Sequence, residues 1–318
     1  ESDLEIFNRR KEAWDAKFPD IASQLLDFKF GDGLEVAMGG GRTNFIPKEL
    51  TDPEYEAERG NRLDGRDLPK EWTSKYKDSA FVWNKAQFDA IDAKKTKHLF
   101  GLFEPSHMKY EYDRAKDPAG EPSLSDMTAK AIDVLAGNKK GYFLMVEGGR
   151  IDHAHHDGNA FRALTETISL SNAVRTALGK VDLSETLIIV TADHSHTLFI
   201  QGYPARGNNI LGLIHEIDND GEYDETAKLD TGKNPMTTLG YANGPGARGT
   251  PRSALTHGEV TQPDYKQEAN IPFGSETHGG EDVAIFAAGV NAHLIRGSME
   301  QNWIFYVMAD ALRLARRK

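Results

Sequence analysis

Six of the 11 histidines lie in three short segments, and each segment also contains carboxylates. The segments run from Glu147 to Asp157, from Thr191 to His196 and from Glu276 to Asp282. The chain has no cysteine, so any metal ion must be held by His, Asp and Glu. Mixed imidazole and carboxylate ligation without thiolate suits catalytic zinc better than structural zinc.

The spacing within the first segment favours a shared metal ion. Asp152 and His156 stand four residues apart, so on one helical turn both side chains point to the same side. The segment follows a predicted strand at residues 141–146, and in open α/β sheets ligands bind beyond the carboxyl ends of strands. A solvated, charged loop is the alternative, and the position at a strand end argues against it.

The other two segments are less specific when each is taken alone. Asp193 and His194 directly follow a predicted buried strand at 187–190, where a sharp turn lets both side chains ligate, although a helix N-cap followed by surface histidines has the same pattern. His278 precedes a predicted strand at 283–287. It reaches the same site only if that strand runs antiparallel or its loop folds back.

Together the three segments offer ligands for two metal ions: Asp152, His156 and His278 for the first, and Asp193 with His194 for the second. Glu147 offers hard oxygen ligands that suit a separate magnesium ion. Two metal ions about 4 Å apart stabilise the attacking and leaving oxygens of a displacement at phosphorus. The predicted chemistry is therefore phosphoryl transfer.

These residues need a scaffold, and the sequence predicts an α/β fold with a mostly parallel central sheet covered by helices on both faces. Short apolar runs alternate with helical patterns along much of the chain. Strands are predicted at 34–38, 99–103, 141–146, 187–190 and 283–287. Helices are predicted from a cap at Ser123 or Ser125 to Gly137, over 161–178, and from Met299 to about Arg317, the last docked through its apolar side chains and ending in three arginines.

One long stretch, residues 202–272, breaks this pattern. It is rich in Gly, Asn, Asp, Thr and Pro and far exceeds an ordinary loop. We therefore predict an insertion or small subdomain there, with residues 1–201 and 273–318 forming the core.

Composition excludes several classes of protein. The chain has 318 residues and a net charge of −11, with no block of basic residues, so general nucleic-acid binding is not expected. The longest apolar run, residues 303–309, is far shorter than the roughly 20 residues of a membrane span. The first seven residues contain neither an initiator Met nor a basic or apolar targeting region, so we expect the true N-terminus to lie upstream.

The three segments, with their flanks, resemble the metal-binding motifs of alkaline phosphatases. The motifs are residues 143–156, 190–196 and 276–286. The resemblance extends over nearly the whole chain through shorter stretches that are similar to the longer, animal-type branch of the family, which also occurs in bacteria: Gly39–Arg42, Asn61–Gly65, Gly101–Pro105, Met108–Glu111 and Gly202–Gly207.

The resemblance implies hydrolysis of phosphate monoesters through a phosphoserine, with two zinc ions and one magnesium ion. It assigns the metal ligands residue by residue: Asp152, His156 and His278 to the first zinc, Asp193 and His194 to the second, and Glu147 to magnesium. His153 and His196 match positions that orient ligands and phosphate.

The animal-type branch has a further calcium site, which the resemblance also implies for this chain. Glu54, Phe103 and Glu104 match that site. Glu121 stands where the family often has Asp.

Several functional residues of the family have no match in this sequence. The nucleophilic Ser, the Asp that bridges the second zinc and magnesium, a Ser or Thr ligand of magnesium and the phosphate-binding Arg belong upstream of the part resembled. Asp78-Ser79-Ala80 repeats the nucleophile's pattern, but it leads into a predicted strand and stands at the wrong place in the order, so Ser79 is not expected to be the nucleophile. We expect upstream residues or a companion N-terminal segment to supply these groups.

The family further implies small phosphomonoester substrates, a homodimer and a periplasmic or extracellular location. It also implies that residues 202–272 form a crown-like insertion over the active-site entrance. Two alternatives stay open: a superfamily relative that acts on phosphodiesters or sulfate esters, and a catalytically silent metal-binding or dimer-forming fragment.

Overall fold

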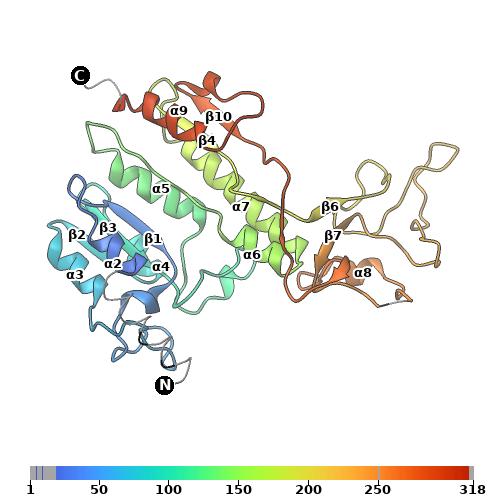
Figure 1. Cartoon of the computed structure of the whole chain (residues 1–318), viewed down its shortest axis with the longest axis horizontal. Coiled ribbons are helices and arrows are strands. Elements are labelled where there is room, and N and C mark those ends of the chain that lie inside the picture. The colour runs from blue at the N-terminus through green and yellow to red at the C-terminus, as the bar shows by residue number, and fades with distance from the viewer. Residues whose placement is uncertain (1–4, 6–8, 10–18, 250, 315–318) are drawn as a thin grey trace. The chain divides into compact units, whose positions relative to one another are not determined.

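The chain forms two compact units, residues 1–146 and 147–318 (Figure 1). The computed structural model describes residues 5, 9, 19–249 and 251–314. Both units contain helices and strands, so the predicted α/β class is confirmed. The proposed division into a core and an insertion at 202–272 remains a prediction. None of the helices in the described ranges is long and apolar enough to cross a membrane.

Unit 1 is built on a three-stranded parallel sheet with the strand order β1-β3-β2. The strands are β1 (Val36–Gly39), β2 (Ser79–Val82) and β3 (His98–Leu102). The helices of the unit include α2 (Ile21–Leu26), α3 (Leu68–Lys75), α4 (Lys85–Asp89) and α5 (Leu124–Leu135), with the short 3₁₀ turns η1 (Arg42–Phe45) and η2 (Arg114–Lys116). All five residues of the central strand are buried, as expected where both faces of a sheet are covered.

Helices cover both faces of this sheet because alternate side chains of β3 point to opposite sides. Phe100 packs against Trp72 of α3 in one apolar cluster. Leu99 packs on the other face with Phe88 of α4 and Met127 of α5. The two clusters are the core of unit 1.

Helix α5 begins at the predicted residue because Ser123 caps it. The Ser123 hydroxyl accepts from the Asp126 N–H at 3.1 Å, and the Asp126 carboxylate accepts from the Ser123 N–H at 3.2 Å. This reciprocal capping box satisfies two backbone donors that a helix start leaves unpaired.

Unit 2 contains four helices and seven short strands among its described residues. The helices are α6 (Arg150–His156), α7 (Ala160–Leu178), α8 (His257–Val260) and α9 (Trp303–Ala311), with the 3₁₀ turn η3 (Ala292–Leu294). The strands are β4 (Leu187–Val190), β5 (Ser195–His196), β6 (Leu198–Ile200), β7 (Leu239–Gly244), β8 (Ala269–Pro272), β9 (His278–Gly279) and β10 (Phe286–Gly289).

The directions of the strands in unit 2 allow His278 to reach the residues of the other two histidine segments. β10 runs antiparallel to β4, and β9 runs antiparallel to β5 with His278 opposite His196. The chain can therefore place a residue that precedes β10 beside residues that follow β4. β6 and β7 are also antiparallel, whereas β7 and β8 are parallel.

The predicted strand at residues 141–146 is wrong. The segment has no strand assignment, and Phe143 and Met145 are 63% and 73% exposed. A strand exists only where its N–H and C=O groups find a neighbouring strand, and none of the described segments pairs with this one.

The C-terminal helix is shorter than predicted. Helix α9 spans Trp303–Ala311, with Val307 fully buried and the Trp303 ring N–H donating to the Leu294 carbonyl at 3.1 Å. These contacts dock it, as expected. The predicted basic end at Arg316 and Arg317 lies outside the described residues.

Replacing Phe100 by alanine should destabilise unit 1 by about 3–5 kcal/mol, because the cavity lies at the centre of the sheet and cannot collapse. Phe100 is 1% exposed. Phe30→Ala is the matched control, since Phe30 is 79% exposed. Urea unfolding followed by Trp fluorescence measures both. Equal effects of the two substitutions would show that the sheet is not the core.

Candidate metal centre

Three short elements of unit 2 carry the histidine motifs to one place. Helix α6 presents Asp152 and His156 one turn apart, while its Ala154 is fully buried against the unit. His196 lies on β5 and His278 lies opposite it on β9. The spacing predicted from the sequence and the antiparallel pairing together build the site.

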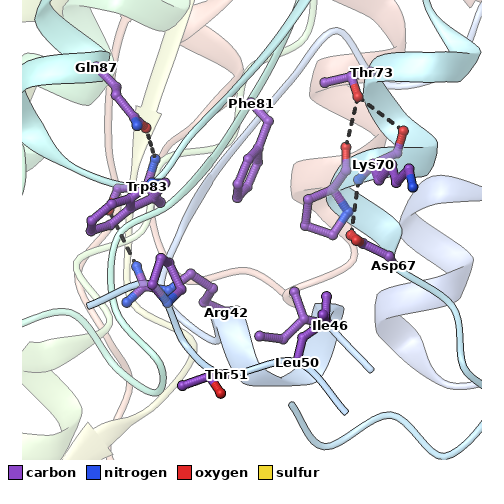
Figure 2. A pocket seen from close by; sticks show the side chains of 12 residues that line it. Arg42, Ile46, Leu50, Thr51, Asp67, Lys70, Thr73, Phe81, Trp83 and Gln87 are labelled. Atoms are coloured by element: carbon purple, nitrogen blue, oxygen red, sulfur yellow. Dashed lines mark hydrogen bonds between the residues drawn. The ribbon is translucent and has the colours of Figure 1, made fainter. Parts of the chain in front are cut away.

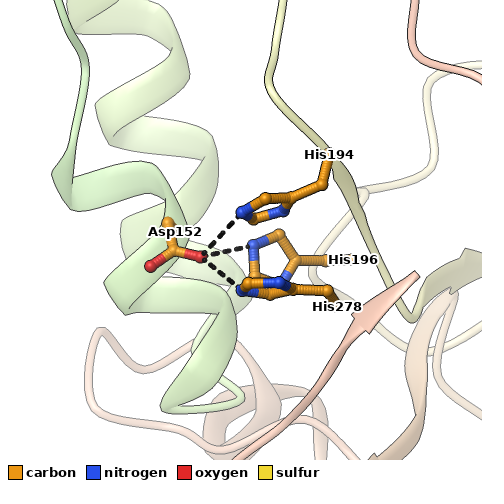
Figure 3. Close-up of side chains that lie close together, drawn as sticks. All are labelled: Asp152, His194, His196 and His278. Atoms are coloured by element: carbon orange, nitrogen blue, oxygen red, sulfur yellow. Dashed lines mark ion pairs between the residues drawn. The ribbon is translucent and has the colours of Figure 1, made fainter. Parts of the chain in front are cut away.

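The carboxylate oxygen Oδ1 of Asp152 is the centre of this arrangement (Figure 3). The Nε2 atoms of four histidines surround it, at 2.9 Å from His196, 3.2 Å from His156, 3.4 Å from His278 and 3.9 Å from His194. The Nε2 atoms of His156 and His278 are 3.1 Å apart. Side chains from positions more than a hundred residues apart in the sequence therefore converge.

The donor set fits a metal ion. Asp152 Oδ1 and His196 Nε2 are buried, and neither has a hydrogen-bond partner among the described residues. Buried polar atoms are normally paired, and convergent unpaired nitrogen and oxygen atoms are satisfied by a cation. Imidazole nitrogens together with a carboxylate suit zinc.

Glu276, which the sequence analysis did not select, holds two of the histidines. Its carbonyl accepts from Nδ1 of His156 at 2.5 Å, and its buried carboxylate accepts from Nδ1 of His196 at 2.7 Å. The same carboxylate accepts from the N–H and hydroxyl of Thr197 at 2.6 and 2.7 Å. Fixing Nδ1 as the donor leaves Nε2 of each ring free to face Asp152.

A second layer of aromatic groups supports His196. The ring of His155 stacks on that of His196 at 4.6 Å, and its Nδ1 lies 2.9 Å from the hydroxyl of Tyr241. Burial first, and then the neighbouring His196, lower the pKa of His155 to about 4. His155 is therefore a neutral packing and hydrogen-bonding group at physiological pH.

Three predicted site residues, Asp193, Glu147 and His153, are not among the side chains that face Asp152 Oδ1. The Asp193 side chain is 83% exposed, and its Oδ2 is 3.5 Å from Nε2 of His194. Glu147 is exposed and joins neither of the metal-competent groups found among the described residues of unit 2. His153 lies beside Arg150, with 3.1 Å between its Nδ1 and the guanidinium.

A different donor set, made only of oxygen atoms, lies in unit 1. The carboxylates of Glu54, Glu104 and Asp117 have atoms within 4.8 Å of one another. Both oxygens of Asp117 and one of Glu121 are buried without a hydrogen-bond partner in the described part of the chain. Phe103, also predicted for this site, is buried and directly precedes Glu104.

Burial and repulsion by neighbouring carboxylates make Glu104 and Glu121 hard to ionise. Burial raises the pKa of Glu104 to about 7, with Asp117 and Glu54 adding to the effect and Lys109 opposing it. Burial, then the charges of Glu104 and Asp117, raise the pKa of Glu121 to about 8. Asp117 was missed in the sequence because it lies in a charged turn, where acidic residues are common.

Arg42 fixes the loop that carries Glu54. It is 1% exposed and donates to Asp52 at 2.7 Å, to Glu54 at 3.0 Å and to the Leu102 carbonyl at 2.9 Å. Gly41, just before it, has a φ of 82°, so the Gly39–Gly41 run forms a structural turn.

A shallow pocket of about 500 Å³ lies over Arg42 (Figure 2). Phe81 and Trp83 line its wall, and Nη1 of Arg42 donates to the Trp83 carbonyl at 3.3 Å. The carboxylate in the lining, Asp67, accepts from the Lys70 N–H at 3.2 Å and so caps α3. The pocket thus has no convergent metal ligands.

Comparison with known proteins defines the class. The sequence profile of the family described as alkaline phosphatase matches residues 3–314. This chain therefore belongs to the alkaline phosphatase family. It is 43% identical to the human tissue-nonspecific alkaline phosphatase isozyme over 300 residues, which are 92% of this chain and 54% of that protein. The chicken isozyme gives 43% over 300 residues and 55% of its length. The chain spans about half the length of these relatives.

Solved structures agree with this class at the level of fold. The cold-active alkaline phosphatase of a psychrophilic Shewanella species has a TM-score of 0.55 and 21% identity, covering 92% of this chain and 68% of that one. A mutant of the TAB5 alkaline phosphatase with Mg bound in its M3 site has a TM-score of 0.56 and 18% identity, covering 92% and 64%.

Replacing Glu276 by glutamine should weaken zinc binding about 10–100-fold with the fold retained. Three donors, the ring N–H of His196 and both donors of Thr197, converge on the carboxylate, and an amide offers only one acceptor oxygen. Competition with a chromophoric chelator measures the affinity, and circular dichroism checks the fold. Glu300→Gln, at an exposed position, is the control. Unchanged affinity in Glu276→Gln would contradict the positioning role.

Proposed function

We propose that this chain carries the metal-binding part of a phosphomonoester hydrolase of the alkaline phosphatase type. The observation that carries the proposal is the convergence of four histidines on Asp152 Oδ1 in a chain of this family. Small phosphomonoesters are the proposed substrates.

The proposed zinc ligands follow the sequence analysis. Asp152, His156 and His278 would hold the first ion, and Asp193 and His194 the second. Bound zinc supplies electrostatic stabilisation of the attacking and leaving oxygens in a displacement at phosphorus. Asp193 is adjacent to His194 in space as well as in sequence, which supports a shared ion.

The remaining residues of the centre orient these ligands. His196, predicted to orient ligands, points Nε2 at Asp152 and donates Nδ1–H to Glu276, a carboxylate–histidine pair of the kind that fixes ring orientation. His153 is proposed to face phosphate with Arg150 beside it.

Magnesium and the nucleophile complete the proposal. Glu147 is the proposed magnesium ligand, and the TAB5 mutant with bound Mg supports magnesium as a metal of this fold. The nucleophilic serine is taken from residues outside this sequence, as the family resemblance implies. On the same grounds we propose a homodimer, a periplasmic or extracellular location and a crown-like role for residues 202–272.

In protein that also contains the upstream residues proposed to supply the nucleophile, His278→Ala should lower the content of the first zinc and reduce hydrolysis of 4-nitrophenyl phosphate by at least about 100-fold, since a direct ligand matters more than its supporting partner. Mass spectrometry of bound metal gives occupancy independently of turnover. His293→Ala, at an exposed position, is the control.

Two results would contradict this assignment. Unchanged zinc content in His278→Ala would exclude His278 as a ligand. Faster turnover of a bis-aryl phosphodiester or an aryl sulfate than of the monoester would favour the superfamily alternatives.

We also propose that four carboxylates of unit 1 bind calcium. These carboxylates, which we call the oxygen-only cluster, belong to Glu54, Glu104, Asp117 and Glu121. The ligand class fits, because calcium takes carboxylate oxygens in irregular geometry, and the unpartnered atoms of Asp117 and Glu121 need a cation. Glu54, Glu104 and Asp117 would supply the closest oxygens, and Glu121 a further one.

Calcium at 100 times its dissociation constant should stabilise the wild-type protein by about 2.7 kcal/mol, and Asp117→Asn should lose most of this gain. Thermal unfolding in calcium and in EGTA measures the difference. Asp89→Asn, which alters an exposed carboxylate paired with Lys85, should keep the full response. An equal response in both variants would exclude Asp117 as a ligand.

A further inference from the structure

The oxygen-only cluster contains a cation of its own. Nζ of Lys109 lies 3.1 Å from Oε1 of Glu104 and 3.2 Å from the hydroxyl of Tyr55. It also lies 5.5 Å from the centre of the Tyr55 ring. A lysine ammonium is a compact point charge, so it interacts with a carboxylate much as a monovalent metal ion would.

The backbone of Lys109 is tied to the cluster while its side chain is partly exposed. The Lys109 N–H donates to Oε1 of Glu121 at 2.9 Å, which ties the residue to the cluster. Its side chain is 36% exposed, whereas that of Glu104 is 4% exposed. The ammonium therefore lies between a buried carboxylate and solvent.

One ammonium cannot satisfy the whole cluster. Arg42 compensates Glu54 at 3.0 Å, and Lys109 compensates Glu104. The oxygens of Asp117 and one oxygen of Glu121 have no partner in the part of the chain that the structure describes. A divalent cation drawn to these oxygens would meet the positive charge of Lys109 at Glu104.

We propose that Lys109 is a built-in competitor of the divalent cation at this site: its ammonium holds Glu104 when the site is empty and swings towards solvent when the cation binds. This inference rests on the calcium site proposed above. Lys109 thereby lowers the affinity for calcium and limits the loss of stability when calcium is absent.

Removing the charge of Lys109 separates its effect on calcium affinity from its effect on stability in the absence of calcium. Lys109→Gln should bind calcium about tenfold more tightly, because a nearby unit charge is removed from a partly screened position. In EGTA the same variant should unfold at a lower temperature than wild type. Lys109→Arg keeps the charge and should retain near-wild-type affinity. Lys95→Gln removes an 85% exposed ammonium elsewhere in unit 1 and should change neither quantity.

Isothermal titration of the purified protein with calcium gives the affinities. Terbium luminescence excited through Tyr55 provides a second measurement, since its hydroxyl lies 3.5 Å from Glu104. If Lys109→Gln proves unstable without calcium, Lys109→Met keeps the apolar stem and replaces it in the titration.

The outcomes distinguish this inference from the calcium site itself. Equal or weaker calcium binding by Lys109→Gln and Lys109→Met, with binding still lost in Asp117→Asn, would overturn the competitor role and leave the site intact. No calcium or terbium binding by wild type and variants alike would overturn both.

Discussion

The structure of unit 2 depends on one carboxylate oxygen. Oδ1 of Asp152 can meet imidazole nitrogens from two other segments only if α6 starts immediately after residues 147–149 and β9 pairs with β5 in the observed register. A shift of one residue in that pairing would turn His278 to the other face. The connection between them is secured by Glu276, whose backbone holds α6 through His156 and whose side chain holds β5 through His196. The third motif therefore connects α6 with β5 and also brings His278 to the centre.

Much of this site could be predicted from local patterns, because the relevant rules are local. The four-residue spacing of Asp152 and His156 on a helix, the cap at Ser123 and a strand at 187–190 are each decided within a few residues, and each is observed, although the strand is half-buried and not buried as predicted. For His278 the sequence left two possibilities, an antiparallel strand after it or a loop that folds back, and β10 runs antiparallel to β4. The helix spacing and the cap are decided by neighbours in the sequence, whereas the pairing of β10 with β4 joins distant segments.

The predictions that failed, and the residues that were missed, depend on contacts between distant parts of the sequence. Residues 141–146 have a strand-like composition, but a strand is defined by its neighbour, and the described residues provide none. The role of Glu276 depends on contacts with residues 80 and 120 positions away, and the sequence offered only a Glu two residues before a selected His. Asp117 likewise becomes a candidate ligand because it is buried beside Glu104. Its position in a charged turn of the sequence does not indicate that burial. Non-local pairing and burial are what single-sequence reasoning cannot weigh.

The two donor sets differ in the chemical groups that they bring together and in how repulsion between those groups is limited. In unit 2 the groups around Asp152 are imidazoles whose Nε2 atoms face one carboxylate oxygen. In unit 1 the ligands are carboxylates, which repel one another, and the chain offsets part of that repulsion with Arg42 and Lys109. Nitrogen-rich ligation selects borderline metals such as zinc, and oxygen-only ligation selects hard cations. Arg42 and Lys109 compensate only part of the unit 1 cluster, because Asp117 and Glu121 keep buried oxygens without a partner in the described chain, as do Asp152 Oδ1 and His196 Nε2 in unit 2. Both proposed sites therefore leave buried polar atoms that a bound cation would satisfy.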